Sequence, residues 1–237
     1  MCPGVTQPTD NPSGIVIAAD VPSLGTLEQL VELAATEPRV YGIKVGFLLA
    51  LRYGLGRVVE TIRQTTALPV IYDHQKAGTD IPQMGPAFAG AVKEAGADEV
   101  IIFPLAGPST LESFLDAALT FELTPYVGLA MSHERYFSSE GGFITESSAT
   151  VALMIGRDRG INRFVLPATK PSLSRSLAGR LGPQPQVVLA PGIGAQGASI
   201  PKTVSALHPH TCLPVVGSAI YQAEDPRVAL TSFVDTL

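Results

Sequence analysis

The 237-residue sequence predicts an α/β protein, a closed (β/α)8 barrel that forms a single domain. Eight short runs of apolar, often β-branched residues alternate with longer stretches of helical periodicity, as in parallel strands covered by helices. Runs such as Val-Val-Leu-Ala at 187–190 are continuously apolar, which is typical of strands buried on both faces. An open doubly wound sheet is the alternative. Its glycine-rich turn after the first strand is replaced here by Ala-Ala-Asp-Val-Pro-Ser at 18–23, so the barrel is favoured.

The apolar runs predict strands in chain order over Ile15–Asp20, Tyr41–Gly46, Pro69–Asp73, Glu99–Pro104, Thr124–Leu129, Arg163–Pro167, Val187–Pro191 and Leu213–Gly217. The stretches of helical periodicity that follow them predict helices over Leu24–Thr36, Leu48–Thr65, Met84–Ala95, Thr110–Thr120, Ser147–Arg159, Ser172–Leu181, Ser199–Leu207 and Pro226–Thr236. Ser109 and Ser172 are expected to cap the helices that begin beside them, because a serine hydroxyl accepts a hydrogen bond from the first turn. Each strand thus leads into a helix, which is the repeat of a barrel.

The composition and the N-terminal sequence limit the functions that the protein can have. Residues 1–13 are polar and contain several prolines, so we expect a tail there and the catalytic barrel over 14–237. The net charge of −5, without any basic run, argues against nucleic-acid binding. The sequence has no signal-peptide pattern and no uninterrupted run of apolar residues long enough to span a membrane, and its two cysteines fit a reducing compartment. These features predict a cytoplasmic enzyme that acts on a small molecule.

Charged residues, which make up only 16% of the chain, gather at the predicted carboxyl ends of strands. In a barrel these ends line the active site. Asp20 ends the first strand, Lys44 lies near the end of the second, and Asp73 ends the third, with Lys76 and Asp80 shortly after it. Lys44 lies in an apolar run, where an ammonium group is costly to bury unless a carboxylate pairs with it. Asp20 alone is also compatible with a helix cap and Lys44 with a paired structural lysine, so the cluster as a whole indicates a site.

The segment Asp73-His-Gln-Lys76-Ala-Gly-Thr-Asp80-Ile-Pro resembles the orotidine 5'-phosphate decarboxylase family. The resemblance extends over about residues 14–225. It includes Asp20, Lys44, Met-Ser-His at 131–133, Pro-Gly-Ile-Gly-Ala-Gln-Gly at 191–197 and Val-Gly-Ser-Ala-Ile-Tyr at 216–221, in the family's order. It implies a TIM barrel enzyme that decarboxylates orotidine 5'-monophosphate to UMP in de novo pyrimidine synthesis, without a metal or any other cofactor.

The resemblance further implies a catalytic array of Lys44, Asp73, Lys76 and Asp80, with Asp20 on the ribose side. Loss of carbon dioxide leaves negative charge at C6 in the plane of the pyrimidine, where the π system cannot delocalise it. Lys76 would stabilise this charge and donate the proton to C6, while Asp73 would lie close to the substrate carboxylate and disfavour the charged ground state. Asp80 would reach across the interface of a homodimer into the partner's site.

The matched motifs also imply which residues bind the rest of the nucleotide. Ser132 would contact the edge of the pyrimidine, and Gln196 would reach the phosphate. Gly194 and the neighbouring glycines would let their loop bend and bring backbone amides close to the anion. Gly217 and Ser218 would lie at the start of a short helix after the eighth strand, where barrels commonly bind phosphate.

The sequence departs from the family pattern between the third strand and the following helix. The family spacing Asp-x-Lys-x-x-Asp is two residues longer here, so we expect a distorted loop between Asp73 and Asp80. Met84 stands where the family has a threonine that contacts ribose across the dimer, and a methionine cannot make that hydrogen bond. Thr79 or Gln83 would substitute for it.

A further departure is Ser218, which stands where the family has an arginine that binds the phosphate through two hydrogen bonds. Arg135 and Lys170 are candidates to replace that cation. Two other functions stay open. One is a magnesium-dependent sugar-phosphate decarboxylase or aldolase of the same superfamily, which would need an additional acidic ligand near Lys44. The other is a catalytically weakened nucleotide-binding relative, which the substitution at Ser218 favours.

Overall fold

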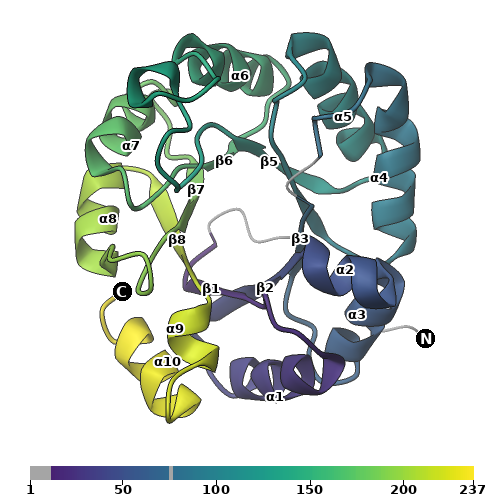
Figure 1. Cartoon of the computed structure of the whole chain (residues 1–237), viewed down its shortest axis with the longest axis vertical. Helices are drawn as coiled ribbons and strands as arrows, with labels where there is room; N and C mark the ends of the chain where they lie inside the picture. Colours follow the sequence, from purple (N-terminus) through teal and green to yellow (C-terminus); the bar gives the residue numbers. More distant parts are fainter. Residues whose placement is uncertain (1–11, 75–76) are drawn as a thin grey trace.

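The computed structural model describes residues 12–74 and 77–237. In these residues the strands form a closed parallel barrel in chain order, with β8 pairing back onto β1, and Figure 1 shows the helices as a ring outside it. The strands are β1 (Ile15–Ala18), β2 (Val40–Gly46), β3 (Val70–Asp73), β4 (Glu99–Ile102), β5 (Thr124–Gly128), β6 (Arg163–Val165), β7 (Val187–Pro191) and β8 (Thr211–Val216). The predicted fold and all of the predicted strands are confirmed, with strand ends that differ by no more than two residues.

Helices follow the strands around the ring. They are α1 (Leu24–Ala35), α2 (Phe47–Tyr53), α3 (Leu55–Arg63), α4 (Gly85–Glu94), α5 (Pro108–Thr120), α6 (Ser147–Asp158), α7 (Pro171–Ala178), α8 (Ile200–Leu207), α9 (Ser218–Tyr221) and α10 (Pro226–Val234), with short 3-10 helices η1 (Pro82–Met84) and η2 (Ser138–Glu140). The single helix predicted over 48–65 is wrong in one respect. Gly54 takes a φ of 78°, which lies outside the helical region, and separates α2 from α3.

The two predicted serine caps are also wrong. The helix α5 begins at Pro108 and α7 begins at Pro171, so Ser109 and Ser172 lie inside the first turn instead of before it. Proline favours the first helical position because its φ is already close to the helical value and its missing N–H would have had no partner there. The proline therefore sets the start of each helix.

Apolar side chains fill the barrel in two layers. Because side chains along a strand point alternately to opposite faces, one set fills the interior of the barrel and the other packs under the helices. Val16, Ile71, Ile101, Leu189 and Val215 belong to the interior set. Polar side chains consequently concentrate at the two ends of the barrel.

The amino-terminal end of the barrel holds a buried polar cluster of Tyr41, Glu99, Tyr126 and Arg163. Tyr41 Oη donates to Glu99 Oε1 at 2.5 Å, and Arg163 Nη1 lies 2.7 Å from Tyr126 Oη and 3.4 Å from Glu99 Oε1. Each of the four residues is at most 8% exposed. Burial raises the pKa of Glu99, although the charge of Arg163 opposes this. The cluster therefore connects β2, β4, β5 and β6 across the interior.

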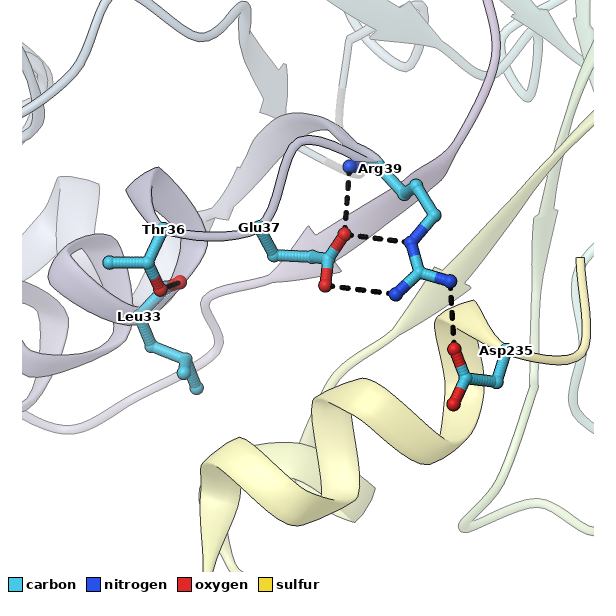
Figure 2. A network of polar contacts seen from close by, with 5 residues as sticks. All are labelled: Leu33, Thr36, Glu37, Arg39 and Asp235. Atoms are coloured by element: carbon cyan, nitrogen blue, oxygen red, sulfur yellow. Dashed lines mark hydrogen bonds and ion pairs between the residues drawn. The ribbon is translucent and has the colours of Figure 1, made fainter.

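An exposed ion-pair network joins the first and last parts of the barrel (Figure 2). Arg39 follows α1 and binds Glu37 through Nε at 2.8 Å and Nη2 at 3.1 Å. Its Nη1 atom binds Asp235, which directly follows α10, at 2.8 Å. Nearby, Arg227 Nη1 donates to Thr36 Oγ1 at 3.2 Å. The network fixes the last helix against the first βα unit, close to where the barrel closes.

The predicted N-terminal tail lies mostly outside the described residues, since only Pro12 and Ser13 of it are described. Its extent therefore stays a prediction. The strand β1 begins at Ile15, two residues after the end of the predicted tail. Over residues 12–74 and 77–237, none of the helices is both long and apolar enough to cross a membrane.

Candidate active site

A pocket of roughly 230 Å³ lies at the carboxyl-terminal end of the barrel. Apolar interior side chains, among them Ile101, Phe103 and Val165, form part of its lining. Seven of the ten predicted site residues also line it, and they follow the ends of six strands: Asp20, Lys44, Asp73, Ser132, Gln196, Gly217 and Ser218. The fold thus brings together residues that lie up to about two hundred positions apart in the sequence.

Lys44 is the central charge of this pocket. Its Nζ atom lies 3.1 Å from Asp73 Oδ2 and 3.4 Å from Asp20 Oδ2. The side chains of Lys44 and Asp73 are 10% and 6% exposed, whereas that of Asp20 is 48% exposed. Burial alone would lower the pKa of Lys44, but the carboxylates of Asp73 and Asp20 outweigh it and raise the pKa above its usual value. Lys44 is therefore a charged ammonium group at neutral pH.

The strand geometry explains why Lys44 points into the barrel. Its neighbours in β2, Ile43 and Val45, belong to the core beneath the helices, and alternation directs the residue between them to the interior. In the adjacent strand, Asp73 pairs with Gly46, two residues closer to the mouth than Lys44. The long lysine side chain spans this offset and reaches the carboxylate.

The segment after β3 carries the other two predicted catalytic residues. Lys76 lies outside the described residues. Asp80 is exposed and lines a separate hollow of about 550 Å³ together with His74, Thr79 and Met84. Its Oδ1 atom accepts a hydrogen bond from Ile81 N at 2.7 Å. Within one chain Asp80 therefore faces away from the Lys44 pocket, and its predicted role across a dimer interface stays a prediction.

The described part of the longer loop between Asp73 and Asp80 is attached to the end of β4. Phe103 N donates to Ala77 O at 2.9 Å, and Ala106 N donates to Gly78 O at 3.1 Å. At its start, His74 Nδ1 is hydrogen-bonded to Tyr72 Oη. These contacts hold both described sides of the loop, whose predicted distortion falls partly on residues 75–76 outside the described part.

Of the predicted binding residues, Gly194 does not line the pocket. It has a φ of 77°, and a Cβ atom there would lie 2.7 Å from Ala219 Cβ. Gly194 therefore allows the loop after β7 to turn and to pack closely on α9. Gln196, in the same loop, and Ser218, the first residue of α9, both reach the pocket.

The predicted replacements for the phosphate-binding arginine lie elsewhere. Lys170 Nζ binds Glu140 Oε2 at 2.7 Å, and neither Lys170 nor Arg135 lines the pocket. Among the described residues of the lining, Lys44 is the one cation. In the described part of the chain, His, Cys, Asp and Glu side chains do not gather in any group of three or more that could hold a metal ion.

Sequence reasoning gave no role in the pocket to Tyr221. It lines the pocket, and its hydroxyl donates to the backbone oxygen of Asp20 at 3.3 Å. The signal that could have found it is its position one short helical turn after Ser218, on the same side of the barrel mouth. Met131, the first residue of the matched Met-Ser-His motif, also lines the pocket.

The chain is similar to known proteins over nearly its whole length. Residues 13–233 match the model of the family described as Orotidine 5'-phosphate decarboxylase / HUMPS family. The chain is 30% identical over 198 residues to the orotidine 5'-phosphate decarboxylase of Methanosarcina mazei, covering 84% of each protein. It is 32% identical over 189 residues to that of Pyrococcus furiosus, covering 79% of this chain and 81% of the relative. The crystal structure of orotidine 5'-monophosphate decarboxylase from Methanocaldococcus jannaschii complexed with inhibitor BMP shares the fold of this chain, with a TM-score of 0.82. The two sequences are 24% identical, and the match covers 96% of this chain and 99% of that one.

Proposed function

Because the chain belongs to the Orotidine 5'-phosphate decarboxylase / HUMPS family, we propose that it decarboxylates orotidine 5'-monophosphate to UMP. The observation that carries this proposal is the buried Lys44, held between Asp73 and Asp20 at the mouth of the barrel. The side chains of Lys44 and Asp73 are nearly buried, and fixed charges of this kind suit a reaction in which negative charge develops on a ring carbon. We further propose that the reaction uses these side chains alone, without a metal or another cofactor.

Asp73 would act on the ground state. Its side chain is nearly buried and is held by Lys44, so it cannot move away when a substrate carboxylate arrives. Two unit charges about 4 Å apart at an effective dielectric constant near 20 repel by roughly 4 kcal/mol. This energy accelerates the reaction to the extent that it is relieved as the carboxylate leaves as neutral carbon dioxide.

Lys76 would complete the chemistry. When the bond between C6 and the carboxylate breaks, its electron pair stays on C6. The Lys76 ammonium group would stabilise this charge and then transfer a proton to C6, which yields UMP and a neutral amine that solvent reprotonates. Lys44 keeps a full positive charge and holds Asp73 in place, so it prepares the site without exchanging a proton itself.

The remaining lining residues would bind the nucleotide. Asp20, half exposed at the rim, is suited to the ribose hydroxyls, and Ser132 is suited to the edge of the pyrimidine. Gln196, Gly217 and Ser218 would bind the phosphate through neutral donors. Gly194 would support them by shaping the loop that carries Gln196.

One assay tests the proposed activity. Purified protein is incubated with orotidine 5'-monophosphate and EDTA, and the loss of the pyrimidine absorbance is followed. We expect turnover that EDTA does not change. Binding of UMP without turnover would instead identify a nucleotide-binding relative, and turnover of a sugar phosphate that needs magnesium would identify the other branch of the superfamily.

We also propose that two copies of the chain form a dimer in which Asp80 completes the partner's site. Asp80 is exposed beside Ile81 and Met84, apolar residues that are 59% and 42% exposed. Apolar side chains around an exposed carboxylate suit an interface that buries them and delivers the charge to a neighbour.

Hybrid dimers test this arrangement. A Lys76→Ala chain and an Asp80→Asn chain are co-expressed with different affinity tags, and dimers that carry both tags are isolated. If Asp80 acts across the interface, one of the two sites in each hybrid has both residues, so about half of the wild-type activity per dimer returns. If Asp80 acts within its own chain, both sites lack a residue and the hybrid stays as inactive as its parents.

A further inference from the structure

Thr169 lies behind the pocket, in the turn between β6 and α7, and contacts two of the loops that carry substrate-facing residues. Its Oγ1 atom donates to the backbone oxygen of Ser132 at 2.8 Å. Ser132 lines the pocket, whereas Thr169 does not. The hydroxyl therefore fixes the residue proposed to contact the pyrimidine without reaching the substrate itself.

The next residue, Lys170, holds the same loop at a second point. Its Nζ atom binds Glu140 Oε2 at 2.7 Å and lies 6.0 Å from the centre of the Phe137 ring. Glu140 Oε2 also accepts hydrogen bonds from Tyr136 N at 3.0 Å and Phe137 N at 3.3 Å. The hydrogen bond from Lys170 lowers the pKa of Glu140, so this carboxylate is charged at neutral pH. The loop over residues 131–140 is thus attached near both of its ends to consecutive residues.

On its other side, Thr169 supports the turn over residues 192–198, which carries Gln196. A Cβ atom on Gly192, whose φ is 105°, would lie 2.6 Å from Thr169 Cγ2. The turn is closed by its own backbone hydrogen bonds, such as Gly197 N to Gly194 O at 2.8 Å. The turn over residues 192–198 therefore packs against the methyl group of Thr169 as one compact unit.

The turn that carries Thr169 and Lys170 is itself firmly anchored. Ser174 Oγ, from the first turn of α7, donates to Pro167 O at 2.8 Å, and Ser174 N donates to Lys170 O at 2.9 Å. Ala168 N donates to Pro191 O at 2.8 Å, which connects the turn to the end of β7. The turn therefore gives Thr169 and Lys170 fixed positions, and these two residues in turn fix the loops that they contact.

We propose that Thr169 is a positioning residue for the reaction, and that it sets the separation between the loop over 131–140 and the turn over 192–198, with Lys170 as the second attachment of the loop. This inference rests on the proposed function, because it assigns the pyrimidine to one loop and the phosphate to the other. Loops held in their binding conformation lose less entropy when the substrate binds, so the pair would strengthen substrate binding although neither side chain touches the substrate.

Thr169→Val tests the hydroxyl, because valine keeps the methyl group against Gly192 and removes the hydrogen bond to Ser132. We expect KM for orotidine 5'-monophosphate and Kd for UMP to rise together by roughly 3- to 10-fold, in line with the loss of one hydrogen bond, while kcat changes less. Thr169→Ser restores the hydroxyl and should return both constants to within about twofold of the wild type. Thr120→Val is the matched control, since it removes a hydrogen bond of the same length, to Asp116 O, at the exposed end of α5.

A second readout does not depend on activity. Arg135 is exposed within the loop, so trypsin cleaves after it when the loop opens. Thr169→Val and Lys170→Met should release the fragment over residues 1–135 faster than the wild type and faster than Thr120→Val, as measured by mass spectrometry. If the cleavage rate, KM and Kd of Thr169→Val match those of Thr120→Val, the positioning role is overturned. It is also overturned if Thr169→Ser is as impaired as Thr169→Val. A wild-type protein that neither binds UMP nor turns over substrate would overturn the proposed function instead, and the cleavage rates would still test the attachment.

Discussion

Replacing Arg163 by methionine tests how the buried polar cluster stabilises the amino-terminal end of the barrel. The side chains of Arg163 and Glu99 are 8% and 0% exposed, and Nη1 lies 3.4 Å from Oε1. Methionine fills a similar volume but donates no hydrogen bond, so an ionised Glu99 carboxylate loses the cation beside it. Removing one partner of a buried ion pair typically lowers the free energy of unfolding by about 3–5 kcal/mol, and we expect a loss of this size for Arg163→Met.

The cost of Arg163→Met has a measurable size. At about 2–4 °C per kcal/mol for a chain of this length, a loss of about 3–5 kcal/mol lowers Tm by roughly 6–20 °C. Tyr126 Oη also loses the hydrogen bond that Arg163 donates to it at 2.7 Å, which adds to the loss. The cluster lies at the end of the barrel opposite the pocket, so kcat measured well below Tm should stay close to the wild-type value.

The effect of Arg163→Met also depends on pH in a defined direction. Burial raises the pKa of Glu99 above its unfolded value of about 4.5, so the folded state holds the proton more tightly than the unfolded state. The stability contributed by this group is therefore fully present below the unfolded pKa and is lost as pH rises through the folded pKa. Without Arg163, which lowers the pKa of Glu99, this loss is larger. The stability difference between wild type and variant should narrow toward pH 4 and widen toward pH 8.

Urea unfolding and thermal melts from pH 4 to pH 8 measure both effects. The control is Arg163→Met combined with Glu99→Gln, which removes the unpaired charge and keeps an acceptor for the Tyr41 hydroxyl. We expect the double variant to recover at least half of the lost Tm at pH 8. A Tm for Arg163→Met within about 2 °C of the wild type, or a loss that is the same at every pH, would refute the argument that an uncompensated buried charge dominates.

Three further predictions concern the pocket and the closure of the barrel. In Gly46→Ala the new methyl group would overlap the Asp20 carboxylate, so we expect KM to rise roughly threefold or more with little change in Tm, measured by steady-state kinetics. Asp73→Asn would remove the proposed repulsion of roughly 4 kcal/mol between Asp73 and the substrate carboxylate, so kcat should fall by up to about a thousandfold while the affinity for the substrate rises relative to that for UMP. An unchanged kcat would contradict this. Arg39→Met should lower Tm more than Arg57→Met, which breaks an exposed pair within one helix, and the difference should shrink at high salt.

The fold was predictable because each barrel strand carries its own signal. A strand buried on both faces must be apolar along its length, so strands such as β7 are recognisable without knowing their partners. Lys44 was predictable for a related reason, since a lysine between apolar residues requires a carboxylate nearby. The resemblance then indicated which carboxylates, and the structure shows two of them, Asp20 and Asp73, within 3.4 Å of the ammonium group.

The cluster at the other end of the barrel could not be found in this way. Glu99 and Arg163 each begin an apolar strand, where a charged residue is ordinarily exposed. They belong to β4 and β6, which are not neighbours in the barrel because β5 lies between them, and they meet only across the interior. No spacing in the sequence encodes such a contact. The same limit applies to Thr169, whose partners Ser132 and Gly192 come from loops that the sequence does not place relative to each other.

The charges of the pocket indicate what the site still requires. Asp20, Lys44 and Asp73 carry −1, +1 and −1, so the described array has a net charge of −1. The proposed substrate brings a carboxylate and a phosphate to it, and negative charge then develops on C6. Binding such an anion requires additional positive charge close to the reacting carbon, and Lys76, which follows Asp73 in the sequence, is the residue proposed to supply it. In the proposed reaction Asp73 would therefore repel the substrate carboxylate. The array would favour the state in which that carboxylate has left and its charge has moved to a carbon that Lys76 can protonate.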